Sequence, residues 1–308
     1  MQSIKQAILL HNPGAGDEDH LESELVTAIE QAGYSCVYFS VAHDDRWIQQ
    51  LDQADFVVVA GGDGTVRGVV KELVKRNVLE RKIPLTILPM GTANNLSMAL
   101  GIDRALEREQ HIEKWATSKR QRFDVGVLKN MDATDFFLEG AGYGVFPQLI
   151  QQMTKIDKNQ VENADEELKL ALEVLHQIIL TAPAEKYWIK ADEQIYQGKC
   201  LLLEVINIPS VGPRLLLCPE AITDDGQFNI VYVDESQRAD FAAYIKKRIN
   251  HEEVLFEYHS FKSRHLTLIC ESKHMHIDDQ LVLPLKDVVT MEVRDYVLEF
   301  MVPAHNPS

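Results

Sequence analysis

Short apolar runs alternate with helix-like segments in the first part of the chain. Apolar residues recur at helical spacing over residues 21–32, which end before Gly33, and again over residues 66–74. Between these segments, runs rich in β-branched and other apolar residues predict strands at residues 7–10, 36–41, 56–60 and 85–88. This alternation predicts a mostly parallel sheet covered by helices, with ligands bound at the carboxyl ends of the strands.

After Phe123 the pattern changes, and strand-like runs follow one another. They occupy residues 136–139, 187–190, 201–206, 228–233, 266–270 and 274–277. Turns are predicted at Gln197-Gly198 and Asp225-Gly226. A helix is predicted only over residues 163–181, where Asn163 and Glu166 have the spacing of a helix cap. We therefore predict an α/β domain over residues 1–123, which residues 290–308 could complete, and a β-rich domain over residues 124–289.

Composition agrees with a two-domain globular protein, because 308 residues exceed the usual size of a single core. Residues 1–10 resemble neither a signal peptide nor a membrane span, so we expect a cytoplasmic protein. The four cysteines form no C-x-x-C pair, which predicts reduced thiols. A net charge of -16 argues against nucleic acid as a partner and against tight electrostatic docking on anionic lipid.

The sequence G-G-D-G-T at residues 61–65, named here the phosphate turn, follows a buried strand and precedes a helix. Glycines let backbone amides approach an anion, and a helix N-terminus adds partial positive charge. Neither a Walker lysine nor a G-x-G-x-x-G spacing is present, so a tight turn with glycines chosen only for geometry is the alternative. Asp63 would repel phosphate unless a divalent cation intervened, which suggests a metal–nucleotide complex.

Two further segments follow predicted parallel strands. They are N-P-G-A-G at residues 12–16 and L-P-M-G-T-A-N-N at residues 88–95. Because the carboxyl ends of parallel strands share one edge of a sheet, we expect the three loops to meet in one crevice.

Together with P-E-A-I-T-D-D-G at residues 219–226, these motifs resemble the diacylglycerol kinase catalytic-domain family, which includes bacterial lipid kinases and sphingosine kinases. NAD kinases and phosphofructokinases share the phosphate turn, but the late segment resembles the lipid kinase branch. The resemblance covers nearly the whole chain. It implies a Rossmann-like α/β domain followed by a β-sandwich domain, with a nucleotide in the cleft between them.

The resemblance also implies site residues. Those implied to bind ATP are Asn12, Ser40, Gly61, Gly62, Asp63, Gly64, Thr65, Val66, Arg67, Gly68, Gly91 and Thr92. A structural Mg²⁺ would be held by Asp225 together with the carbonyls of Ile222 and Gln227. The alternative for that segment is a plain hairpin turn.

Three positions depart from the family pattern. Arg67-Gly68 stands where the family has Asn-Glu, and Asn95 stands where it has Asp. The late D-G-E, whose glutamate is thought to accept the proton of the substrate hydroxyl, falls on Asp278-Asp279-Gln280. A glutamine cannot accept this proton, and a missing general base costs about 10²- to 10⁴-fold in rate. Asp278 is the substitute we predict, because strand alternation would place it on the face of Gln280.

Two smaller signals have structural alternatives. The pattern His274-x-His276 suggests metal ligands, whereas the simpler interpretation is a half-exposed strand with its polar side chains outward. Glycines at positions 140, 142 and 144 lack dinucleotide-motif spacing, so we expect them to bend the chain or let a substrate approach.

These observations favour a kinase that uses ATP and Mg²⁺ to phosphorylate a lipid hydroxyl of the diacylglycerol or sphingoid-base type. Asp63 and either Gln280 or Asp278 would form its catalytic group. The protein would bind its lipid substrate during brief contacts with the membrane surface and would have no transmembrane segment. A homodimer is compatible with the sequence. A nucleotide-binding protein with weakened or lost catalysis is one alternative. A kinase of a soluble alcohol is another.

Overall fold

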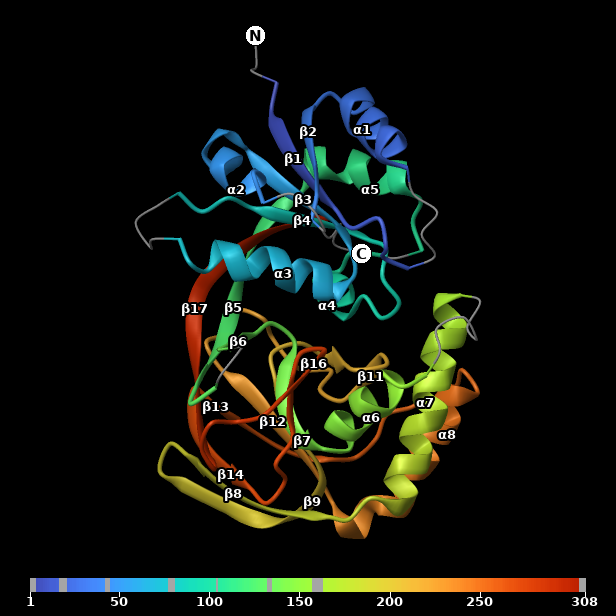
Figure 1. The fold of residues 1–308 in the computed structure, drawn as a ribbon, viewed down its shortest axis with the longest axis vertical. Helices are drawn as coiled ribbons and strands as arrows, with labels where there is room; N and C mark the ends of the chain where they lie inside the picture. The colour runs from blue at the N-terminus through green and yellow to red at the C-terminus, as the bar shows by residue number, and fades with distance from the viewer. Residues whose placement is uncertain are drawn as a thin grey trace. The chain divides into compact units, whose positions relative to one another are not determined.

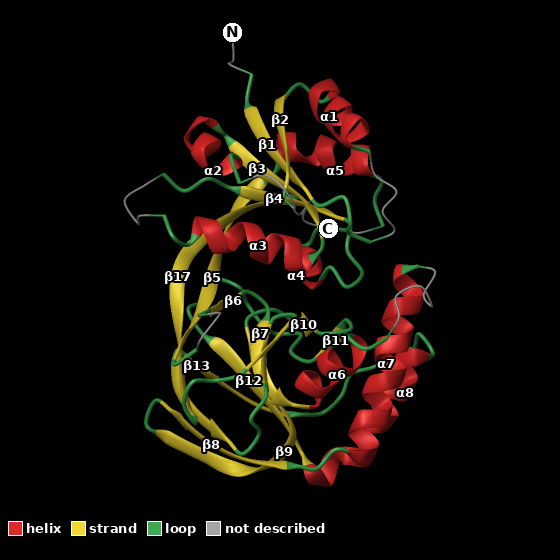
Figure 2. Cartoon of the chain, viewed as in Figure 1, coloured by secondary structure: helices red, strands yellow, loops and turns green. Residues whose placement is uncertain are grey.

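A computed structural model describes residues 4–16, 21–41, 45–76, 81–103, 105–131, 135–156 and 163–304 (Figures 1 and 2). The chain divides into two compact units. The first unit comprises Met1–Phe123 and Tyr296–Ser308, and the second unit comprises Asp124–Asp295. A parallel α/β part is followed by mostly antiparallel strands, so the predicted fold class is confirmed.

The first unit is built on a parallel sheet with the strand order β17-β4-β3-β1-β2. Its strands are β1 (Gln6–His11), β2 (Ser35–Ser40), β3 (Phe56–Gly61), β4 (Leu85–Pro89) and the last part of β17 (Val288–Val302). Residues 7–11 of β1 and all of β3 are buried. Their continuous apolar runs are what a sheet covered on both faces requires.

Helices cover both faces of this sheet. They are α1 (Glu22–Gln31), α2 (Trp47–Gln50), α3 (Asp63–Leu73), α4 (Asn95–Ala99) and α5 (Arg108–Lys114), with 3₁₀ turns η1 (Leu51–Gln53) and η2 (Trp115–Thr117). Leu25 and Ile29 of α1 pack with Ile112 of α5 against Leu9 and Val58 of the sheet. Helix α3 contacts β3 and begins at Asp63, three residues before the apolar pattern predicted, because the phosphate turn itself forms its first turn.

The second unit is a largely antiparallel sheet with the order β16-β15-β7-β9-β8-β14-β17, from which β12 and β13 branch at β9. Apart from β17, the strands of this unit are β5 (Lys119–Lys129), β6 (Phe136–Phe137), β7 (Gly140–Gly144), β8 (Glu185–Ala191), β9 (Gln194–Ile206), β10 (Ser210–Val211), β11 (Leu215–Leu216), β12 (Phe228–Asp234), β13 (His259–Ser263), β14 (His265–Cys270), β15 (Met275–Ile277) and β16 (Gln280–Val282). Strands β10 and β11 pair with each other in a separate small sheet. Apolar side chains from these strands enclose one core, which includes Phe137, Tyr143 and Phe228.

In the part of the second unit that the structure describes, the α-helices are α6 (Val145–Met153), α7 (Ala164–Thr181) and α8 (Arg238–Ile249), the last preceded by η4 (Glu235–Gln237). The predicted helix and its cap are confirmed, because the Asn163 side chain accepts the Glu166 N–H at 3.0 Å. Helix α7 packs against α6 and α8 (Figure 2). Helix α6 was not predicted, and it holds Pro147 in its first turn, where proline is tolerated.

The turn predicted at Gln197-Gly198 was wrong. Both residues lie inside β9, where Gly198 pairs with Tyr187 of β8. The chain reverses instead at Asp192 and Glu193, and Asp192 adopts a φ of 51° there. Gly226 in the other predicted turn adopts a φ of 72°, a conformation that favours glycine.

All four cysteines are free thiols, as predicted. No helix within the described ranges is long and apolar enough to cross a bilayer.

Candidate functional site

Three loops meet at the carboxyl edge of the first unit's sheet, as the sequence predicted. They follow β1, β3 and β4, which are neighbours in that sheet. The Asn12 side-chain amide donates to the Thr65 hydroxyl at 3.0 Å and so joins the first loop to the phosphate turn. The Met90 N–H donates to the Gly61 carbonyl at 3.1 Å and joins the third loop to the same turn.

The phosphate turn and the third loop touch through their backbones. A Cβ placed on Gly91 would lie 2.4 Å from the Cα of Gly62, and a Cβ on Gly62 would lie 3.0 Å from the Cα of Gly91. No side chain fits between them at this separation. The glycines therefore bring two strand ends and the N-terminus of α3 together, an arrangement whose backbone amides suit phosphate oxygens.

Asp63 fastens this contact with its carboxylate. One oxygen accepts the Asn95 N–H at 2.8 Å and the other accepts the Leu96 N–H at 3.0 Å. These amides belong to the first turn of α4, whose N-cap residue Asn94 provides no side-chain cap. Asp63 thus satisfies helix-end donors that would otherwise lack a partner within the helix. Its role beside a metal–nucleotide complex stays a prediction.

Asn94 was missed as a site residue, although its motif was recognised. It adopts a φ of 54°, and its side-chain oxygen accepts the Gly91 N–H at 3.0 Å. Its side-chain amide donates back to the Gly91 carbonyl at 2.5 Å. In the segment G-T-x-N, the last residue therefore closes the loop by bonding to the backbone of the first. The signal was available in the sequence, because asparagine is among the few residues that tolerate the left-handed region.

The other predicted nucleotide residues differ in what they can offer. Ser40 ends β2 beside His11, at the same edge of the sheet. Val66 and Arg67 are buried, and the Val66 N–H already donates to the Gly62 carbonyl at 3.1 Å. Gly68 is exposed, one turn further along α3, and no atom lies within 4 Å of a Cβ placed there. Gly64 lies in the first turn of α3, and Thr92 lies in the loop after β4.

The predicted cation turn lies in the second unit. Asp225 accepts the Gln227 N–H at 3.0 Å through one carboxylate oxygen and contacts the Lys262 ammonium at 2.8 Å through the other. Buried Asp124 holds the same turn by accepting the Gly226 N–H at 2.8 Å. Lys262 therefore already supplies the positive charge that the family resemblance assigns to Mg²⁺, and Asp225 does not fit a divalent ion while this contact persists.

We expect Asp225→Ala to lower the melting temperature equally in Mg²⁺ and in chelator. The ion pair is partly exposed, with side chains 19% and 35% accessible, so its loss should cost about 1 kcal/mol or less. Lys262→Met is the matched variant and should cost a similar amount. Thermal unfolding of both variants in both buffers measures this. A loss confined to Mg²⁺ buffer would instead assign a cation to Asp225.

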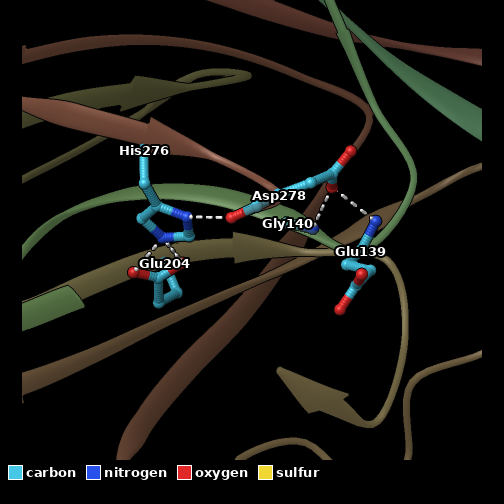
Figure 3. A network of polar contacts seen from close by, with 5 residues as sticks. All are labelled: Glu139, Gly140, Glu204, His276 and Asp278. Atoms are coloured by element: carbon cyan, nitrogen blue, oxygen red, sulfur yellow. Dashed lines mark hydrogen bonds and ion pairs between the residues drawn. The ribbon is translucent and has the colours of Figure 1, made fainter. Parts of the chain in front are cut away.

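The hairpin of β15 and β16 carries the predicted acceptor-side residues. Ile277 pairs with Gln280, so Asp278 and Asp279 form the turn between the strands. The argument that Asp278 shares a strand face with Gln280 was therefore wrong. Gln280 is exposed, whereas the Asp278 carboxylate accepts the backbone N–H groups of residues 138–140, with its Oδ1 at 2.9 to 3.2 Å (Figure 3).

His276 lies inside the second unit, which overturns the expectation of an outward polar side chain. It is 3% exposed, and its Nε2 lies 2.9 and 2.8 Å from the two carboxylate oxygens of the fully buried Glu204 (Figure 3). His274 is exposed. Within the described ranges, no three His, Cys, Asp or Glu side chains are grouped closely enough to hold a metal ion.

Burial shifts the titration of both partners in this pair. Burial alone lowers the pKa of His276, but the Glu204 carboxylate and the Asp278 carbonyl outweigh it, so the pKa of His276 is raised. Burial raises the pKa of Glu204, and His276 offsets this only in part. The pair is therefore suited to hold a proton above the pH at which a free histidine loses one.

Comparison with known proteins supports the family resemblance. The sequence model of the diacylglycerol kinase catalytic domain matches residues 6–128, which include all three loops. The resemblance inferred from the motifs is thereby confirmed.

Relatives extend the likeness across most of the chain. A diacylglycerol kinase of Bacillus subtilis (strain 168) is 27% identical over 246 residues, which cover 77% of each chain. One of Staphylococcus haemolyticus is 24% identical over 265 residues, covering 82% of this chain and 76% of the relative.

Solved structures show the same fold. A diacylglycerol kinase of Bacillus anthracis str. Sterne superposes with a TM-score of 0.70 at 19% identity and covers 100% of this chain and 99% of its own. An NAD kinase of Archaeoglobus fulgidus, solved in complex with ATP, gives 0.51 at 14% identity, covering 97% of this chain and 94% of its own.

Proposed function

We propose that this protein is a lipid kinase that transfers the γ-phosphoryl group of ATP to a hydroxyl of a diacylglycerol-type lipid. The family match and the named relatives support a kinase acting on such a lipid. Mg²⁺ would accompany the ATP phosphates, since a metal ion commonly neutralises charge during phosphoryl transfer.

The backbone contact between Gly62 and Gly91 carries this proposal. It brings the N-terminus of α3 and the loop after β4 to within a distance that admits no side chain. A cradle of this kind offers amide donors to phosphate oxygens without requiring a Walker lysine. Asp63, Asn94 and the Asn12–Thr65 contact hold the cradle in shape before any ligand arrives.

On the acceptor side, Gln280 would orient the lipid hydroxyl without removing its proton. Phosphoryl transfer relies mainly on positioning and charge stabilisation, so turnover would be slow and not absent. A nucleotide-binding protein with lost catalysis is the second candidate. One observation favours it: the carboxylate of Asp278, the alternative base, already accepts hydrogen bonds from backbone N–H groups.

A panel of acceptors separates the two functions. The purified protein is incubated with labelled ATP and Mg²⁺ together with diacylglycerol, a sphingoid base or glycerol. We expect label to transfer to diacylglycerol in mixed micelles and not to glycerol. Transfer to glycerol would instead make the protein a soluble-alcohol kinase. ATP binding without transfer to any acceptor would establish the binding-protein function and overturn the kinase.

A further inference from the structure

Three neighbouring strands of the second unit place a glycine between a histidine and a glutamate. Gly142 of β7 pairs with His276 of β15 on one side and with Glu204 of β9 on the other. Residues paired across adjacent strands point to the same face of a sheet. The two charged side chains can therefore meet above Gly142 only because Gly142 has no side chain. A Cβ there would lie 2.4 Å from a Glu204 carboxylate oxygen.

The side-by-side arrangement of His276, Gly142 and Glu204 is named here the buried row. It explains the glycine at position 142, because the buried Glu204 carboxylate needs the space that a side chain there would fill. Glu204 is 0% exposed, and Phe146 of α6 packs its ring edge-on against His276 at 5.6 Å. Among the described residues, the charged groups that act on the imidazole are Glu204 and Asp278, and α6 places the uncharged ring of Phe146 against it. An unpaired charge would be costly in such surroundings, so the pair is expected to stay together.

Hydrogen-bond chemistry fixes where the protons lie. The Nδ1 of His276 is 2.9 Å from the carbonyl oxygen of Asp278, which can only accept, so Nδ1 must carry a hydrogen. A second hydrogen must lie between Nε2 and Glu204. Without it, a nitrogen lone pair would face a carboxylate oxygen at 2.8 Å. The row therefore holds one proton beyond those of a neutral histidine and an ionised glutamate.

The same histidine determines the shape of the turn before Gln280. Asp278 is held at every polar group: its N–H donates to the Gly140 carbonyl at 2.8 Å, and its carbonyl accepts from His276. Its carboxylate accepts from residues 138–140. These contacts keep Asp278 at a φ of 50°, which a non-glycine residue rarely adopts without support.

We propose that Glu204 and His276 are positioning residues whose shared proton holds the Asp278 turn, and through it Gln280, in the geometry that presents the acceptor hydroxyl. This inference rests on the proposed function for the role of Gln280. The locking of the turn itself does not depend on that function. Both side chains are buried away from any surface that a substrate could reach, so they would act through the hairpin.

Because the contact between Glu204 and His276 needs this proton, its stability depends on pH. In the unfolded chain His276 loses its proton near the ordinary value of 6.5, whereas in the folded protein its pKa is raised. The stabilisation is therefore complete below pH 6.5 and is lost as pH rises through the folded pKa. Acceptor turnover should fall on the same alkaline limb.

Glu204→Gln tests the proposal with little change of shape. The glutamine amide can donate to the Nε2 of a neutral His276, so the pair no longer needs the extra proton and the variant should lose the alkaline limb of the pH profile. The neutral hydrogen bond that remains is weaker than the charge-assisted one and should hold the turn less firmly. We expect kcat/KM for the lipid to fall about 10- to 100-fold, as small misplacements near a reacting group do. The KM for ATP should stay unchanged, and the amides of residues 138–140 and 278 should exchange hydrogen faster.

His259→Gln is the matched control, since His259 pairs with Asp234 at 3.2 Å on the exposed part of the same unit. Gly142→Ala is a second variant, which crowds Glu204 while both titratable groups remain. Lipid kinetics and amide exchange of Glu204→Gln equal to those of the control would overturn the proposal. If the natural protein phosphorylates no acceptor, the proposed function fails. The exchange data alone then decide whether the pair locks the turn.

Discussion

Replacing Gly62 with valine is expected to abolish ATP binding while the fold persists. A Cβ at this position would lie 3.0 Å from the Cα of Gly91, and valine adds two further methyl groups. Overpacking of this kind costs about 1–3 kcal/mol. Displaced amides would also lose charge-assisted hydrogen bonds to phosphate worth about 1.5–3 kcal/mol each. The loss of two such hydrogen bonds corresponds to a fall in affinity of about 10²- to 10⁴-fold, which titration calorimetry with MgATP measures.

Gly198→Val is the matched control for this substitution. Gly198 lies in β9 of the second unit, where a Cβ would meet the Tyr187 ring at 3.4 Å, an ordinary contact distance. This variant should bind ATP as the natural protein does. Unchanged ATP affinity in Gly62→Val, with circular dichroism showing both variants folded, would remove the phosphate turn from the nucleotide site.

Gln280→Glu is expected to raise the rate of lipid phosphorylation by about 10²- to 10⁴-fold, the range that a general base contributes. The exposed position of Gln280 beside the hairpin turn accommodates a carboxylate without burying its charge. Because the substitution lies outside the three loops of the first unit, ATP affinity should change little. The measurement is kcat with labelled ATP and diacylglycerol, alongside calorimetry for ATP.

Gln197→Glu supplies the same change of charge on an exposed residue of β9 and should leave the rate unchanged. Brisk turnover by the natural protein, unaltered in Gln280→Glu, would mean that another group acts as the base. Asp278→Asn would then have to remove the activity, although Asp278 also anchors the hairpin. Amide exchange of residues 138–140 would separate loss of a base from loss of that anchor.

Local signals predicted much of the first unit. The apolar strands ending in G-G-D-G-T and L-P-M-G-T lie close to their expected bounds, because each carries its own turn residues. The cap at Asn163 was equally readable, since donor and acceptor are three residues apart. Such features depend on residues that are close together along the chain, so they can be predicted from the sequence alone.

Contacts between distant residues could not be predicted in the same way. Glu204 and His276 are 72 residues apart, and their meeting depends on β7 lying between β9 and β15 with a glycine at the shared position. The contact between Asp225 and Lys262 requires the pairing of β12 with β13. The two backbone N–H groups of α4 that donate to Asp63 could not be predicted either, because nothing in the G-G-D-G-T motif reveals them.

The last strand has a consequence for how the protein is made. Residues 296–302 of β17 complete the first unit: Phe300 pairs with Leu85, and the Met301 carbonyl accepts the Thr86 hydroxyl from 215 residues earlier. A ribosome therefore releases the whole second unit before it delivers the strand that covers the edge of β4. Contacts so distant in sequence close slowly. The sheet whose loops form the candidate site therefore gains this strand only after the second unit has been synthesised.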